Sequence, residues 1–101
     1  MIKTTTDYLQ GHEKLTYVGI VTSETIVGVN VVRDIFASIT DFFGGRSTTL
    51  ESALKDARES CLKELEERAK TLGSDALIGI SIETQISNMV TVTAVGTAVK
   101  F

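Results

Sequence analysis

The sequence contains no proline and no tryptophan, and its 101 residues include one cysteine and one histidine. A single cysteine excludes a disulfide within the chain. No apolar run approaches the roughly 18 residues that a membrane-spanning helix requires, and the first residues lack the pattern of a secretory signal. These absences favour a cytoplasmic protein in a reducing environment, without a membrane partner.

Charge and catalytic residue types are also sparse. The net charge is −3 and the basic residues form no cluster, so we expect no nucleic-acid partner. Because His12 is the only histidine, no serine has an evident base of the kind that activates a nucleophile. Cys61 likewise has no evident activating base. We therefore expect no enzymatic activity.

The residues that are present describe one globular domain over residues 1–101. The apolar fraction of 43% and the charged fraction of 23% are ordinary for such a domain. A chain of this length buries about 60–65% of its unfolded surface on folding. It can therefore fold alone, but it gains stability from association.

The clearest element is a helical run over residues 50–72. Its apolar residues recur at steps of three or four, which is the stripe of an amphipathic helix. The residues Thr48 to Glu51 predict a capping box at the start, and Gly73 suits the left-handed position after the end. We expect this helix to cover one face of a sheet. The stripe consists of Leu50, Leu54, Ala57, Cys61, Leu65, Ala69 and Leu72.

Alternating residues predict the sheet. A strand is expected over residues 15–21, with Val18 and Ile20 on one face and a break at residues 22–25. A hairpin is expected from strands at 76–86 and 90–99, with the even-numbered residues of its first strand on one face.

The fold class is therefore α+β. It is a two-layer structure in which a mainly antiparallel sheet is covered by one long helix, with a shorter helix before it over residues 30–43. Residues 1–6 fit a strand or an edge segment. The residues expected in or near the core are Val18, Ile20, Leu54, Ala57, Leu65, Ile78, Ile80, Val92 and Ala94.

Two chemistries are open for a binding site, and metal binding is the first. A soft-metal site needs several thiolate or imidazole ligands, and one subunit offers only Cys61 and His12, without Cys-x-x-Cys or His-x-x-x-His spacing. Several copies of Cys61 could converge across a rotation axis. A small thiol packed in the core explains the same residue without a metal.

The second candidate is an anion site at Gly44, Gly45, Arg46 and Ser47. The glycines free the backbone, Arg46 adds a positive charge, and the start of the long helix offers N–H groups and the positive end of the helix dipole. A tight turn between helices, with Arg46 paired to a carboxylate, explains the same residues. Close by, Arg33 and Asp34 lie beside an apolar face and predict an ion pair within or between subunits.

Two segments carry a family resemblance, namely Asn30-Val31-Val32-Arg33-Asp34-Ile35-Phe36-Ala37 and Gly44-Gly45-Arg46-Ser47. Together with smaller matches along nearly the whole chain, they resemble the YbjQ-like family of uncharacterised proteins, which is labelled "putative heavy-metal-binding". The smaller matches are Thr4-Thr5-Thr6, Gly19-Ile20-Val21, Ala57-Arg58-Glu59, Leu72-Gly73-Ser74-Asp75-Ala76 and Gly96-Thr97-Ala98-Val99.

The resemblance implies a compact, dodecin-subunit-like α+β subunit and a ring-shaped homo-oligomer, most often a pentamer. It implies a heavy-metal ion as a ligand and no established catalytic activity. Combined with the residues, it leads us to expect a homo-oligomer that binds a metal ion or a small anion at subunit contacts. The alternative is a structural or protein-interaction module without a small ligand.

Overall fold

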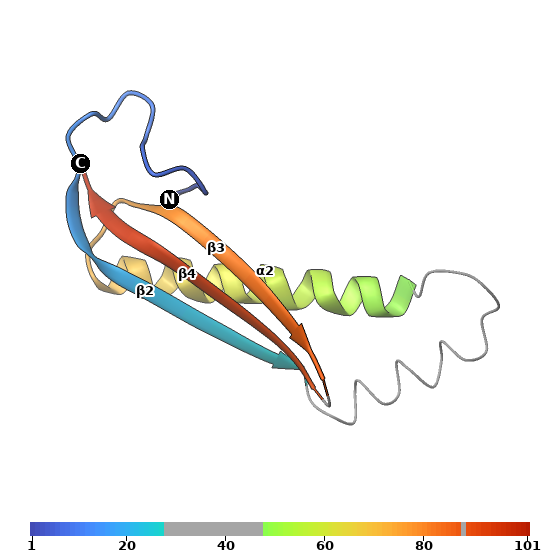
Figure 1. The fold of residues 1–101 in the computed structure, drawn as a ribbon. Coiled ribbons are helices and arrows are strands. Elements are labelled where there is room, and N and C mark those ends of the chain that lie inside the picture. Colours follow the sequence, from blue (N-terminus) through green and yellow to red (C-terminus); the bar gives the residue numbers. More distant parts are fainter. Residues whose placement is uncertain (28–47, 88) are drawn as a thin grey trace.

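The computed structural model describes residues 1–27, 48–87 and 89–101. Four strands form one sheet in the order β1-β3-β4-β2, and the long helix lies across one of its faces (Figure 1). The fold is α+β with two layers, as predicted. The shorter helix expected over residues 30–43 lies outside the described residues. The elements are β1 (Ile2–Lys3), β2 (Thr16–Val27), α2 (Thr48–Thr71), β3 (Ala76–Ile86) and β4 (Val90–Lys100).

Helix α2 begins and ends close to the predicted positions. It starts at Thr48, has Glu51 in its first turn, and is followed by Gly73, whose φ of 75° is the left-handed conformation that favours glycine. The amide of Gly73 donates to the carbonyl of Lys70 over 2.9 Å, and Ser74 donates to Ala69 from its amide at 3.3 Å and from its Oγ at 2.7 Å. Among the described residues, no helix has both the length and the apolar character needed to cross a membrane.

The main core lies between α2 and the sheet. The predicted stripe of the helix is buried at its centre, where Leu65 and Cys61 are completely enclosed, but Leu72 is exposed at the end of the helix. Six of the predicted core residues are buried, and Val18 and Leu54 are partly buried at the rim of the cluster. The confirmed buried residues are Ala57, Leu65, Ile78, Ile80, Val92 and Ala94.

The prediction for Ile20 was wrong, because β2 contains a bulge. Tyr17 is opposite Val99 and Gly19 is opposite Ala98, so one extra residue is inserted between them. The insertion reverses the alternation, since a shift of one residue moves every later side chain to the other face. Ile20 is therefore 77% exposed. The break expected at residues 22–25 is also absent, since β2 runs on to Val27.

A second irregularity interrupts β3. Its register against β4 shifts between Ile78 and Ser81, and Gly79 has a φ of 60° at this point. Before the shift, Ala76 and Ile78 face away from α2, whereas Ile80 after it packs in the cluster beneath the helix. The single face predicted for the even-numbered residues of β3 was therefore wrong.

The sheet is antiparallel except for β1, which pairs with β3 in parallel, so it is mixed. Within the part of the chain that the structure describes, its face away from α2 is covered at one end, where Leu9 and Leu15 pack on Ala76, Ile78 and Val99. We call the rest of that face the open face. It consists of Ile20, Thr22, Glu24 and Ile26 of β2, Ser81, Glu83 and Gln85 of β3, and Thr91, Thr93, Val95 and Thr97 of β4. The dodecin-subunit likeness stays a prediction.

Candidate functional site

Most of the predicted site residues lie outside the described residues. The anion-site candidates Gly44, Gly45, Arg46 and Ser47 fall within residues 28–47, as does the pair of Arg33 and Asp34. These assignments stay predictions. Cys61, the predicted metal ligand, is the one candidate that the structure describes.

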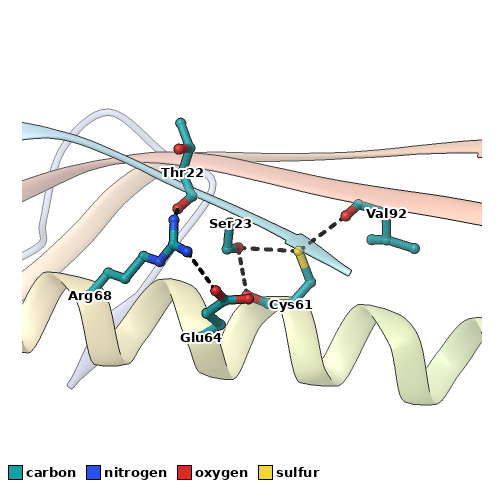
Figure 2. A network of polar contacts seen from close by, with 6 residues as sticks. All are labelled: Thr22, Ser23, Cys61, Glu64, Arg68 and Val92. Carbon is teal, nitrogen blue, oxygen red and sulfur yellow. Dashed lines mark hydrogen bonds and ion pairs between the residues drawn. The ribbon is translucent and has the colours of Figure 1, made fainter. Parts of the chain in front are cut away.

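Cys61 lies on the face of α2 that packs on the sheet, and its exposed fraction is 0%. Its Sγ is 3.2 Å from the Oγ of Ser23 on β2 and donates to the carbonyl of Val92 on β4 over 3.5 Å. The Ser23 hydroxyl donates to the carbonyl of Cys61 over 2.7 Å, so the two residues contact each other twice (Figure 2). The helix is thus tied to two neighbouring strands by one buried polar cluster.

This cluster satisfies its own polar groups. Within the described residues, every buried side-chain nitrogen or oxygen has a hydrogen-bond partner. The same residues contain no group of three or more histidine, cysteine, aspartate or glutamate side chains that is placed to hold a metal ion. His12, the other soft-metal ligand type, stacks instead on Phe101 with ring centroids 3.9 Å apart. Cys61 as a metal ligand stays a prediction.

Replacing Ser23 by alanine is expected to lower the free energy of unfolding by about 0.5–1.5 kcal/mol, the usual contribution of one internal hydrogen bond. The Cys61 carbonyl and Sγ both lose the Ser23 hydroxyl as a partner. The carbonyl remains part of the backbone of helix α2. Urea unfolding followed by circular dichroism measures the change. Thr22→Ala is the matched control, because Thr22 is the exposed neighbour and uses only its backbone carbonyl; it should change stability by under about 0.5 kcal/mol.

Beside the buried cluster, Arg68 reaches from α2 to the outer edge of β2. Its Nη1 donates to the carbonyl of Thr22 over 2.7 Å, and its Nη2 is 2.7 Å from Oε1 of Glu64 (Figure 2). A groove of about 370 Å³ adjoins this contact and is lined by Ile20, Val21, Thr22, Arg68, Thr71 and Leu72. Sequence reasoning missed Arg68, although its i,i+4 spacing from Glu64 is the pattern of a helical ion pair.

Exposed apolar residues of two strands gather on the open face. Ile20 and Ile26 of β2 are 77% and 54% exposed, and Val95 of β4 is 39% exposed. They share one face, because Ile20 is opposite Thr97, Ile26 is opposite Thr91, and Val95 is opposite Thr22. This face therefore carries Ile20, Thr22, Glu24 and Ile26 of β2 beside Thr91, Thr93, Val95 and Thr97 of β4. Exposed apolar residues that gather on one face of a sheet are suited to contact with another protein surface.

Comparison with known proteins gives a consistent result. A family model described as "Putative heavy-metal-binding", that of YbjQ, matches residues 1–101. A UPF0145 protein of Synechococcus sp. (strain JA-3-3Ab) is 52% identical over 101 residues, which cover 99% of this chain and 98% of the relative. A UPF0145 protein of Pseudomonas entomophila is 49% identical over 104 residues with the same coverage. Neither name gives an enzymatic activity.

Among solved structures, a protein of unknown function from Pediococcus pentosaceus, assigned to the DUF74 family, has a similar fold. Its TM-score is 0.68, and the match covers 100% of this chain and 97% of that one. The sequence identity is 16%, so this similarity concerns the fold alone.

Proposed function

The chain belongs to the YbjQ family, and on this premise we propose that it is one subunit of a homo-oligomer that binds a metal ion or a small anion where subunits meet. The observation that carries the proposal is the open face, with its exposed Ile20, Ile26 and Val95. The pentameric ring of subunits that the resemblance implies is part of this proposal.

Burying the open face against another copy would stabilise both subunits. Removing apolar surface from water contributes about 25 cal/mol per Å², and a domain of this size leaves a large share of its apolar surface exposed. Threonine side chains between the apolar residues carry no charge, so their desolvation costs less than that of ion pairs. Charged residues on the open face include Glu24 of β2 and Glu83 of β3, which lie opposite Thr93 from either side.

The ligand part of the proposal follows from the family description and from Arg46. Since the described part of one subunit contains no metal-ligating group, a metal ion would take its ligands from more than one subunit or from residues outside the described ranges. A small anion would be held by Gly44 to Ser47, with the charge of Arg46. Arg33 and Asp34 would form their ion pair across subunits.

Native mass spectrometry of the untagged protein, purified without a chelator, tests the proposal. We expect a closed ring, with extra mass in whole-number ratio to the subunits that begins to identify the ligand. A ring without extra mass would favour the alternative, a structural or interaction module that uses the same open face. A monomer at micromolar concentration would contradict the oligomer and the family-based argument for shared sites.

A lysine at Ile26 is expected to break the assembly, because it places a charge in the buried part of the proposed interface. The matched control is Ile86→Lys. Ile86 is 52% exposed, against 54% for Ile26, but it is opposite Val90 and so lies on the face that packs on the helix. Sedimentation should show dissociation of the Ile26 variant and an intact oligomer for the control. If both variants keep the wild-type mass, the open face is not the interface.

A further inference from the structure

Residues 1–6 lie along the outer edge of β3 and are held there by backbone hydrogen bonds. The amide of Thr4 donates to the carbonyl of Leu77 over 3.0 Å. In return, the amide of Gly79 donates to Thr6 over 2.7 Å and that of Ile80 to Thr4 over 3.1 Å. The two adjacent amides can both point outward because the strand bulges at Gly79.

Apolar side chains contribute little to holding this segment. All of its residues are exposed except Thr4, which is half-buried, and the apolar Ile2 is 48% exposed. The first buried apolar residue of the chain is Leu9. Segments with few buried apolar contacts open more easily than the fold as a whole. Residues 1–6 therefore need another source of stability to stay in place.

Glu66 on α2 supplies that source. One of its carboxylate oxygens, Oε2, is 3.3 Å from Nζ of Lys3. The other, Oε1, is 3.5 Å from the amine of Met1 and 4.0 Å from Nζ of Lys70. Three positive groups thus surround one carboxylate whose side chain is only 18% exposed, and two of the three belong to the N-terminal segment.

The segment covers an apolar groove as well as a strand edge. The groove has a volume of about 260 Å³. One wall consists of Lys3, Thr4 and Thr5, and the other consists of Leu62, Ile80 and Ile82. Moving residues 1–6 away would expose the apolar wall and free the backbone groups of β3 from Leu77 to Ile80.

We propose that residues 1–6 form a clasp, which the ion pairs of Glu66 lock over the edge of β3, and that neutralising this carboxylate opens the clasp while the rest of the fold stays closed. The open form presents a bare strand edge beside an apolar groove, which is the arrangement that accepts an additional strand.

A fall in pH neutralises the carboxylate of Glu66 and so opens the clasp. The hydrogen bond from Lys3 holds the pKa of Glu66 below its usual value, aided by the charges of Lys3, Lys70 and the Met1 amine. A lowered pKa means that the lock is complete above the unfolded-state pKa of about 4.3 and is lost as the pH falls through the lower pKa of the folded protein. The clasp therefore stays closed at neutral pH and opens as the pH falls through the lowered pKa of Glu66.

Site-resolved amide hydrogen exchange on the full chain tests the clasp. The amides of Gly79 and Ile80 report its opening directly, because their acceptors lie in residues 1–6. The amides of β4 lie between two strands and report opening of the sheet. In Glu66→Gln at pH 7, protection of Gly79 and Ile80 should fall by at least about threefold, while protection of β4 stays at the wild-type level.

Two further variants keep the result decisive. Glu64→Gln removes a carboxylate from the same helix whose partner is Arg68, and it should leave Gly79 and Ile80 fully protected. Lys3→Met removes the facing cation at an exposed position, so it carries the test if Glu66→Gln folds poorly, and it should repeat the loss. Unchanged protection of Gly79 and Ile80 in both clasp variants would overturn the proposal, as would an equal loss throughout β4.

Discussion

Replacing Leu65 by alanine should lower the free energy of unfolding by about 2–5 kcal/mol. Leu65 is completely buried at the centre of the cluster between α2 and the sheet, and it is among the largest fully enclosed side chains in the described residues. Alanine removes three carbon atoms there and leaves a cavity. A long helix on one side and a hydrogen-bonded sheet on the other cannot close that cavity by a small shift.

Urea unfolding followed by circular dichroism, at one fixed protein concentration, measures this loss. Fixing the concentration removes the contribution of any self-association to the apparent stability. Leu72→Ala is the control, because Leu72 directly follows the same helix but is 49% exposed; it should cost less than about 1 kcal/mol. A loss below half a kcal/mol in Leu65→Ala would contradict the assignment of this stripe to the core.

A valine at Gly96 is the second large effect, and we expect a loss of about 1–3 kcal/mol from overpacking. Gly96 lies on the helix-facing side of β4. A Cβ atom at this position would be 3.1 Å from Cγ1 of Ile80, 3.5 Å from Cδ2 of Leu77 and 3.6 Å from the carbonyl of Ile78. Valine adds two more methyl groups to this contact, so the side chain of Ile80 must shift.

Gly19→Val on the neighbouring strand is the matched control. A Cβ atom at Gly19 meets nothing within 4 Å. Valine, which is β-branched, is also more favourable in a strand than glycine. Thermal unfolding of the two variants should therefore separate them, with Gly96→Val less stable than wild type and Gly19→Val equal to it or more stable. An equal loss of thermal stability in the two variants would mean that these glycines are needed for their backbone conformation, and that lack of space at Gly96 is not the cause.

The sequence predicted the elements with a long repeat and misassigned the faces of the strands. The helix follows from a stripe that continues over several turns and from Gly73, and both are visible in the residue pattern alone. The faces of β2 and β3 depend on bulges near Gly19 and Gly79, and one inserted residue reverses a strand. The pairing partner fixes where a bulge occurs, so alternation within one strand does not predict it.

The candidate site was less predictable for a related reason. Whether Cys61 is a core thiol or a metal ligand depends on the residues around its side chain. Two of these residues, Ser23 and Val92, lie on strands far away in the sequence. Arg68 caps the carbonyl of Thr22 because β2 is an outer strand next to α2, which the residue pattern does not show. The outward position of Ile20 on the open face was hidden by the bulge in β2.

The strand order also determines how this chain folds during its synthesis. In the described sheet, β2 pairs only with β4, so about 60 residues must be added after β2 before its partner exists, which at 5–20 residues per second takes roughly 3–12 seconds. The hairpin of β3 and β4 forms within microseconds once both strands are available. Joining β2 to it must close a long loop, the type of contact that slows folding. Until then the apolar side chains of Ile20, Val21 and Ile26 on the nascent β2 have no strand to pack beside.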